Sequence, residues 1–367
     1  MKRVIAIVVA MTLGVGLLSA QNLEERLQTM AANNAKAYLN PFVTAFGTAM
    51  NSGWYFTAKP HKLLGFDIGV RAMAVEIPKA QQTFNFDVSA LDLSETITIG
   101  ANTYTVHLDP ETIYPDRKVP TAFGSKEGGY IPAISDDEIV TEFENQLLTQ
   151  GVSQTILDQP TVQNNLYSIA NNIPDLETPP GFDLAYFAIA LPQASLGISL
   201  PMLPIHLELS GRYLPEVKIS DEIGKFKFVG VGGKLALDPF IPLPLFGIKI
   251  AAGAYMQKLE VGKIIESNHA LYSLQVSRDF NLLLLGFGLY GGIGKETSDF
   301  KVKYTYNNTG NPHDPLNGTQ INFDLKGEND FRTTLGVRVR LAFLNINADI
   351  SNGTDKVATA GVSLTLR

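Results

Sequence analysis

The sequence predicts an all-β protein, a transmembrane antiparallel β-barrel of about 12–14 strands with a short N-terminal helical plug and a large mixed insertion. Segments that alternate apolar and polar residues run longer than the five or six residues usual in soluble sheets. Only 18% of the 367 residues are charged, below the quarter typical of soluble domains. No internal apolar run is long enough for a spanning helix. The predicted strands are therefore expected to cross the membrane.

The N-terminal residues 1–20 have the pattern of a secretory signal peptide. Lys2 and Arg3 precede an apolar run that ends in Ser19-Ala20, which fits a cleavage site. We expect this segment to be cleaved, and an uncleaved anchor is the alternative. The chain has no Cys, which excludes a lipoprotein anchor, disulfides and cysteine-ligated zinc.

A short amphipathic helix is predicted at Leu23–Tyr38, where apolar residues recur at helical spacing. Asn40-Pro41 is expected to end it, because proline interrupts helical hydrogen bonding. Residues 21–52 form the predicted plug segment, and residues 53–367 form the predicted barrel.

Sustained alternation predicts the barrel strands. The clearest segments are Phe66–Ala74, Ile205–Tyr213, Ile248–Gln257, Phe331–Leu341, Leu344–Ile350 and Ala358–Leu366. A secreted β-sandwich is the rival interpretation, since periodicity does not tell inside from outside. Aromatic residues near predicted strand ends favour the membrane barrel, whose interfaces carry aromatic girdles. These are Trp54, Tyr55, Phe56, Tyr213, Tyr272, Phe300, Tyr304 and Tyr306.

The polar face of these strands is predicted to line the lumen. One arginine on the lipid face would cost about 2–4 kcal/mol at the midplane, so the register is strongly constrained. The candidate lumen or ligand-binding residues are Asp67, Arg71, His206, Glu208, Arg212, Lys249, Arg332, Arg338 and Arg340.

The stretch Asn281–Tyr306 is apolar on nearly every residue at its start and alternates afterwards. Leu283, Leu285, Phe287 and Leu289 are predicted to face lipid; Leu282, Leu284, Gly286, Gly288, Tyr290 and Gly292 are predicted to face the interior and touch the plug. Farther on, the apolar residues move to even positions such as Phe300 and Tyr304. This change of parity predicts a bulge or turn between Gly294 and Asp299.

Residues 78–180 read as a large insertion between two strands. Ser135 and Glu138 have capping-box spacing, and apolar residues then recur at helical spacing. Two interpretations stay open: an apolar surface that captures a hydrophobic ligand, or a small core of the insertion itself. The residues concerned are Ile139, Phe143, Leu147, Ile156 and Leu166.

No motif in the chain indicates catalysis. The five His are scattered, and the HExxH, GxSxG, Walker and helix-preceding GxGxxG patterns are missing from the sequence. His206 and Ser210 share one face of a strand, which is more typical of a hydrated wall than of a catalytic pair. We expect no catalytic residues, no metal and no cofactor. The net charge of −7 argues against nucleic acid as a partner.

The layout resembles the FadL-type family of outer-membrane transporters for hydrophobic compounds, and a group of uncharacterised outer-membrane barrels of Bacteroidetes-like bacteria. The resemblance rests on the export signal, the helix ending in Asn40-Pro41-Phe42, the small-residue stretch TAFGTAMNSGW at residues 44–54, and the many long strands. FadL-type proteins carry Asn-Pro-Ala in this region, whereas this chain has Phe42. Its last residue, Arg367, also departs from the aromatic end of many outer-membrane barrels.

The resemblance implies a passive channel for small hydrophobic compounds in the bacterial outer membrane. Asn40, Pro41 and Phe42 would belong to a luminal hatch, and residues 78–180 would form an extracellular cap. The implied partners are outer-membrane lipid, a small hydrophobic ligand and the barrel-assembly machinery. Two alternatives remain: a structural or surface-binding barrel with a closed lumen, and a secreted soluble β protein that binds a ligand.

Overall fold

A computed structural model describes residues 32–199, 204–220, 224–241, 246–262, 264–282, 284–305 and 318–366, without the side chains of 217–220, 224–226 and 282. The predicted signal peptide (residues 1–20), Leu283 and Tyr306 lie outside these ranges. The chain forms two compact units. One contains residues up to 81 and from 182 onwards, and the other contains residues 82–181.

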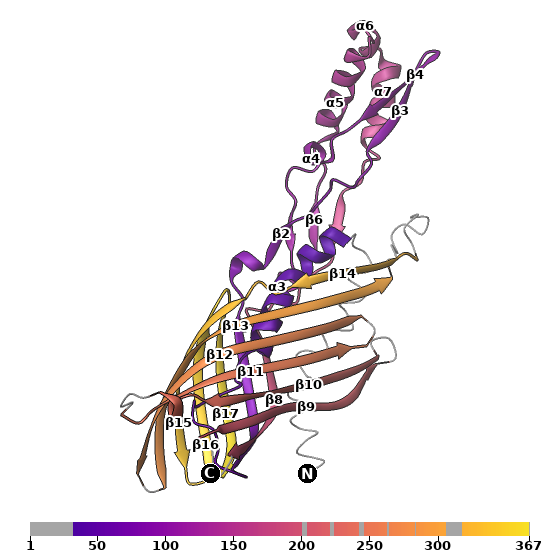
Figure 1. Ribbon diagram of the computed structural model, residues 1–367. Helices are drawn as coiled ribbons and strands as arrows, with labels where there is room; N and C mark the ends of the chain where they lie inside the picture. Colours follow the sequence, from indigo (N-terminus) through magenta and orange to yellow (C-terminus); the bar gives the residue numbers. More distant parts are fainter. Residues whose placement is uncertain are drawn as a thin grey trace. The chain divides into compact units, whose positions relative to one another are not determined.

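The first unit is an antiparallel sheet that closes on itself (Figure 1). Its strands are β1 (Phe66–Glu76), β8 (Tyr186–Ser199), β9 (His206–Ser220), β10 (Gly224–Ala236), β11 (Ile248–Val261), β12 (Ile265–Leu282), β13 (Leu285–Thr305), β14 (Gln320–Lys326), β15 (Phe331–Leu341), β16 (Leu344–Asn352) and β17 (Lys356–Leu366). The hydrogen-bonded order is β12-β11-β10-β9-β8-β1-β17-β16-β15-β13, and β13 pairs again with β12. The predicted all-β antiparallel barrel is confirmed.

The ring contains fewer strands than expected. Among the described residues it has ten strands, and β14 pairs only with the end of β13 that extends beyond the ring. The expectation of 12–14 was too high. It left open whether Phe182–Leu200 and Asn281–Tyr306 are each one strand or two, and each contributes one, β8 with 14 residues and β13 with 21.

The outer face of the ring is apolar and its inner face is polar. On β17, Val362, Leu364 and Leu366 are exposed, whereas Ser363 and Thr365 are buried. The same arrangement recurs on β16, β15 and β13 and forms an apolar belt around the barrel. A soluble sandwich has the opposite polarity, so this is the architecture of a transmembrane barrel.

Strand β13 is continuous where a bulge was predicted. Even-numbered residues face the interior throughout, and pairing with β12 continues without a register shift. On the outer face, apolar residues give way to charged ones from Lys295 onwards. The inner face becomes apolar beyond the same level, at Phe300, Val302 and Tyr304. Both faces of this uninterrupted strand change polarity at the same level. In the sequence, this looks as if the apolar residues had moved from odd to even positions through a bulge.

Several predicted orientations of aromatic and apolar side chains were wrong. Phe300 and Tyr304 are buried inside the barrel and do not belong to an interfacial girdle. Leu284 is 74% exposed, in the turn before β13, and does not face the interior. Trp54, Tyr55 and Phe56 lie buried inside the barrel, whereas Tyr213 and Tyr272 are exposed on its outer face as predicted.

Helix α3 (Ala32–Met50) runs inside the barrel and packs against β14, β1, β13 and β8. It continues through Asn40-Pro41, where the sequence predicted its end. Proline removes one helical hydrogen bond and strains the preceding turn. Burial of Tyr38, Leu39 and Val43 on the same helix offsets that loss. None of the described helices has the length and apolar character to cross a membrane.

The second unit combines small hairpins and helices. Its elements are β2 (Thr83–Asn85), β3 (Ser94–Ile99), β4 (Asn102–His107), α4 (Pro110–Ile113), β5 (Lys118–Pro120), β6 (Gly129–Ile131), α5 (Asp136–Thr149), α6 (Gln154–Leu157), α7 (Pro160–Ala170) and β7 (Leu176–Thr178). The predicted capping box between Ser135 and Glu138 starts α5.

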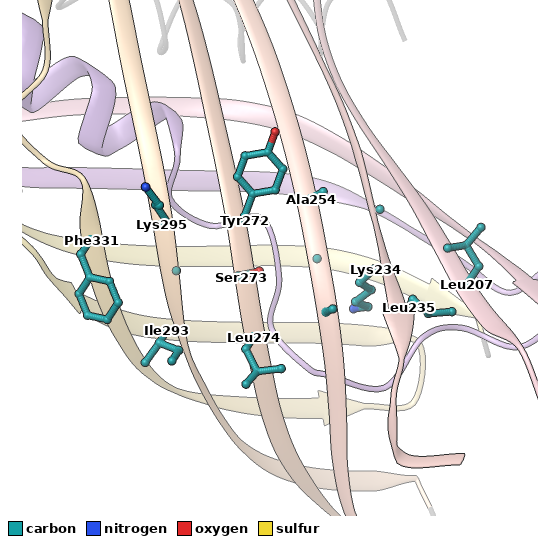
Figure 2. A pocket seen from close by; sticks show the side chains of 14 residues that line it. Leu207, Lys234, Leu235, Ala254, Tyr272, Ser273, Leu274, Ile293, Lys295 and Phe331 are labelled. Atoms are coloured by element: carbon teal, nitrogen blue, oxygen red, sulfur yellow. The ribbon is translucent and has the colours of Figure 1, made fainter. Parts of the chain in front are cut away.

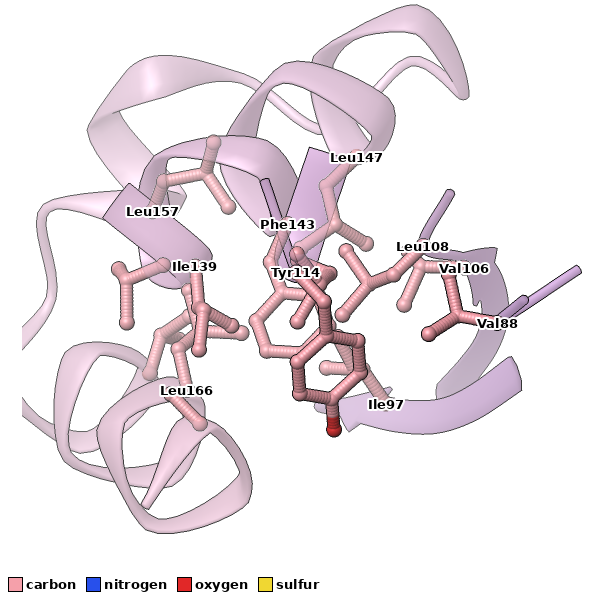
Figure 3. Close-up of a cluster of buried hydrophobic side chains, with 14 of the residues drawn as sticks. Val88, Ile97, Val106, Leu108, Tyr114, Ile139, Phe143, Leu147, Leu157 and Leu166 are labelled. Atoms are coloured by element: carbon pink, nitrogen blue, oxygen red, sulfur yellow. The ribbon is translucent and has the colours of Figure 1, made fainter. Parts of the chain in front are cut away.

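The apolar residues of this unit form its own core. Ile139, Phe143, Leu147 and Leu166 are buried in one cluster with residues of β3 and β4 (Figure 3). Ile156 is not part of that cluster and is partly exposed. Of the two interpretations left open, the structure supports a separate small core, because these side chains are already covered.

The apolar belt predicts that a charged residue on the outer face of β13 destabilises the barrel, and that the effect depends on its depth in the membrane. Leu289→Arg should lower the free energy of unfolding in lipid vesicles by about 2–4 kcal/mol. Thr297→Arg, on the same face but beyond the belt, should have little effect. A soluble barrel would tolerate both changes equally, which denaturant titration in vesicles would reveal.

The core of the second unit predicts a local loss of stability. Phe143→Ala leaves a cavity among α5, α7 and the hairpin, and should cost about 3–5 kcal/mol. Hydrogen exchange should accelerate in residues 82–181 and stay unchanged in the barrel. Uniform acceleration over the whole chain would contradict the division into two units.

Candidate functional site

The lumen of the barrel is occupied by residues 32–65, which we call the plug. It consists of helix α3 and the connection that follows it to β1. Most of this connection is buried, including Asn51, Ser52, Trp54 and Phe56. The interface between the plug and the inner wall of the barrel is the candidate functional site.

Arg212 of β9 binds the carbonyl end of helix α3. Its guanidinium donates to the carbonyl oxygens of Met50 at 3.0 Å and Ser52 at 2.7 Å. The same group lies 4.0 Å from the ring centroid of Trp54, which stacks on Tyr255 of β11 at 4.7 Å. The last carbonyls of a helix lack partners and carry the negative end of its dipole. Arg212 therefore supplies hydrogen-bond donors to these carbonyl oxygens and a positive charge at the negative end of the dipole.

Arg332 of β15 binds the same end of the helix from the other side. It donates to the Thr48 carbonyl at 3.0 Å and the Ser52 hydroxyl at 2.6 Å. Its Nε also donates to Glu296 of β13 at 2.6 Å, and all these groups are buried. The pair joins two neighbouring strands of the wall, and Arg332 binds the end of the helix to them.

A second buried charge pair holds the lower part of the plug. Lys234 of β10 lies 3.0 Å from Glu208 of β9 and donates to the Thr57 carbonyl at 2.8 Å. Glu208 also accepts a hydrogen bond from the backbone N–H of His61 at 3.0 Å. Two oppositely charged side chains of the wall thus each bind the plug backbone.

Phe56 lies against two wall arginines. The guanidinium of Arg71 is 4.8 Å and that of Arg338 is 5.8 Å from its ring centroid. Arg71 pairs with Asp67 at 2.9 Å, and Arg338 pairs with Asp279 at 2.8 Å. Each of these buried cations thus has a carboxylate partner, which offsets the cost of removing it from water.

The upper level of the plug interface is mainly aromatic, with the buried His269 of β12 beside Phe46 and Phe300. Phe46 of α3 packs against Phe187 of β8 at 5.6 Å and Phe300 of β13 at 5.8 Å between ring centroids. Phe42 lies 5.8 Å from both Phe46 and Phe187, so the three rings contact one another. At Gly47 a side chain would collide with Ser298 of the wall, so the helix approaches β13 closely.

The site therefore has two chemically distinct levels. Around helix α3 the wall offers aromatic and aliphatic side chains, including Phe300 and Val302. Below it the wall offers charged side chains that hold the plug backbone, including Arg332, which is paired with Glu296, and Arg212, which is bound to Gln193 and Gln257. The upper level therefore holds the plug by ring contacts, whereas the lower level holds it by hydrogen bonds from charged side chains.

Six of the nine predicted lumen residues lie inside the barrel: Asp67, Arg71, Glu208, Arg212, Arg332 and Arg338 are all buried. The other three lie at the rim or near it. Arg340 is half-buried and binds Asn281 at 2.9 Å. Lys249 pairs with Asp238 at 2.6 Å, and the exposed His206 lies 3.2 Å from Ser199.

His206 and Lys249 meet at a small pocket of about 180 Å³, together with Lys59, His61 and Asp238. His206 shows no contact with Ser210, whose hydroxyl bonds to Ser195 at 2.8 Å. The described residues contain no group of three or more His, Asp or Glu that could hold a metal ion.

The predicted plug residues Asn40, Pro41 and Phe42 lie in the middle of helix α3. Asn40 donates to Glu328, in the connection between β14 and β15, at 2.6 Å. Phe42 belongs to the aromatic contacts described above. The motif is therefore a helical segment of the plug and not the turn that ends a helix.

Several residues of the site were missed from the sequence. Glu296 was overlooked because a bulge was expected at its position. Lys234 was overlooked because the glycine-rich strand β10 has weak alternation. Trp54 was assigned to an interfacial girdle, although its position beside the small residues of TAFGTAMNSGW is a signal for close packing in the plug.

A model of the DUF6588 family, described as a family of unknown function, matches residues 1–366. The chain belongs to this family. No curated protein matches the DUF6588 chain.

Two solved structures show the level of similarity to other barrels. The β-domain of the Bordetella autotransporter BrkA is 15% identical, with a TM-score of 0.21, and the match covers 48% of the DUF6588 chain and 90% of that domain. A Pseudomonas aeruginosa FadL homologue is 11% identical, with a TM-score of 0.28, and covers 88% and 97%. Similarity at this level does not specify a function, and membership of the FadL-type family stays a prediction.

Loss of the Arg332 side chain should loosen the plug of this DUF6588 protein. Arg332→Ala leaves Glu296 buried without its cation, and breaking such a pair typically costs about 3–5 kcal/mol. Hydrogen exchange in residues 32–65 should accelerate accordingly. Arg340→Ala, which removes an arginine of the same strand that binds only the wall residue Asn281, is the control and should leave exchange in the plug unchanged. Equal exchange in both variants would contradict the proposed anchoring.

Proposed function

We propose that this protein is an outer-membrane channel through which small hydrophobic compounds pass passively, and that the plug closes it at rest. The observation that carries the proposal is the apolar level around helix α3. There Phe46 of the plug covers Phe187 and Phe300 of the wall. An apolar compound can replace one aromatic contact by another, so it competes with the plug for the same surface.

The apolar belt supports insertion into a membrane. Exposed residues such as Leu289, Leu335 and Leu364 would be costly in water and favourable in lipid. Insertion into the bacterial outer membrane, after cleavage of residues 1–20, agrees with a closed antiparallel barrel, the form in which strands span membranes.

The connections favour one orientation in that membrane. Only Ala342 and Phe343 separate β15 from β16 at one end of the barrel. The insertion leaves the sheet after Glu76, which pairs with Tyr186 at the other end. Short turns of outer-membrane barrels face the periplasm, so we place the insertion on the extracellular side.

The plug contacts favour release by small displacements. Arg212 and Arg332 bind backbone carbonyl oxygens of the plug, and water can replace either partner. A displaced plug would therefore leave Arg332 paired with Glu296, and Arg212 bound to Gln193 and Gln257 and open to water. Flux would follow the concentration gradient, with no cofactor and no catalytic step.

A second candidate is a structural or surface-binding barrel with a permanently closed lumen. The observation in its favour is the number of independent anchors, since Arg212, Lys234 and Arg332 each bind the plug backbone. In that case the insertion would supply the binding surface.

Flux into proteoliposomes separates these functions. We expect a hydrophobic fluorescent dye to enter vesicles that contain the protein faster than empty vesicles. Arg332→Ala should raise the rate several-fold because the plug is less firmly held, whereas Arg340→Ala should match the wild type. A hydrophilic dye of similar size serves as the selectivity control.

The outcomes are distinct. No flux of either dye in the wild type and in Arg332→Ala would favour the closed structural barrel. Equal flux of both dyes would indicate an unselective pore and would contradict the role of the apolar level. Heat-modifiable gel migration of each variant confirms that the barrel has folded.

A further inference from the structure

The outer wall of the barrel carries an apolar groove of about 730 Å³, which lies over strands β9 to β13 and β15 (Figure 2). Its volume falls within the range of about 300–1,000 Å³ for pockets that bind small molecules. Its side chains come from the lipid-facing row of each strand, including Leu207, Leu274 and Ile293. The plug fills the opposite face of this wall, so the groove is separate from the lumen.

Small residues in the middle of the wall create the hollow. Ala254 pairs with Gly233 on one side and with Tyr272 on the other. A Cβ atom at Gly233 would lie 2.7 Å from the backbone carbonyl oxygen of Glu208. Only glycine therefore fits at this position of β10. Leucines and aromatic residues of the neighbouring strands rise on both sides of the small residues.

A cation lies at one end of the groove. Lys295 is exposed, and it pairs with Tyr272 on one neighbouring strand and with Phe331 on the other. Within the described part of the chain, no carboxylate pairs with Lys295. The other lysine of the groove, Lys234, is buried and its ammonium is bound to Glu208, so it is not available to a ligand.

Lys295 lies at the edge of the apolar belt, at the depth where lipid headgroups meet a transmembrane barrel. Leu289 and Ile293 on the same face of β13 are apolar, and the face is charged beyond Lys295. The row Tyr272, Lys295, Phe331 is therefore at the upper edge of the belt, where aromatic girdles meet the interface. Apolar walls below and one cation at the edge match an acyl chain that bears an anionic headgroup.

We propose that the groove is a binding site for one membrane lipid, with an acyl chain over Gly233, Ala252 and Ala254 and a phosphate on Lys295. The proposal rests on membrane insertion, which is part of the proposed function, and is independent of transport. The lipid would brace the wall at Lys234, whose side chain points inward and binds the plug backbone.

Lipid titration followed by native mass spectrometry tests the site. The probes are dioleoyl phosphatidylglycerol and dioleoyl phosphatidylcholine, which share their chains and differ in headgroup charge. The full protein in detergent should bind one phosphatidylglycerol more tightly than further copies. Ala254→Leu, which fills the groove with an apolar side chain, should weaken this first site at least tenfold. Ala360→Leu, an outward-facing alanine on β17, is the matched control and should have no effect.

The headgroup contact has its own test. Lys295→Gln should abolish the preference for phosphatidylglycerol over phosphatidylcholine, while Lys301→Gln on the same face should keep it. Unchanged binding in Ala254→Leu would overturn the proposal. So would a dimer that Ala254→Leu dissociates, because a second copy of the chain would then occupy the groove. Normal dye flux together with failed lipid binding would reject the lipid site alone.

Discussion

The binding of the carbonyl end of helix α3 by Arg212 and Arg332 is the interaction on which the interior of this barrel depends. A helix that ends inside a protein leaves carbonyl oxygens without partners, and in a medium of low polarity each one is costly. Two guanidinium groups from opposite parts of the wall satisfy them and oppose the helix dipole. The position of the helix end then determines where Trp54 and Phe56 lie, and hence how the lower lumen is filled.

The polarity of the wall follows from what each level has to contact. Phe300 faces the apolar side of helix α3, whereas Glu296, two inward-facing positions earlier, faces the helix end and its arginine. On the outside, the same strand passes from lipid-facing leucines to charged residues. A ligand that displaces the apolar contacts would therefore act on the plug without disturbing the ion pairs of the wall, which is the physical basis of the proposed gating.

Much of the barrel was predictable because a strand with period two has only two faces. Six charged residues expected in the lumen, among them Arg71 and Arg338, are buried there. On the lipid-facing side of the same strands, a charged side chain would destabilise the barrel. The errors arose where contacts between distant residues outweighed a local sequence preference, or where the environment changed along one strand. Pro41 was expected to end a helix, and its cost is offset by burial in the barrel. Glu296 was missed because a change in environment along β13 looked like a change in register.

The sequence by itself determined the antiparallel membrane-type barrel and the identity of most inward-facing charges, because alternation and burial cost act residue by residue. Only the tertiary structure decided that ten strands close the ring, that residues 32–65 fill it, and which groups pair inside it. These features depend on contacts between residues far apart in the chain, such as Arg332 with Thr48. Such contacts follow from the shear and closure of the whole barrel, which no local pattern specifies.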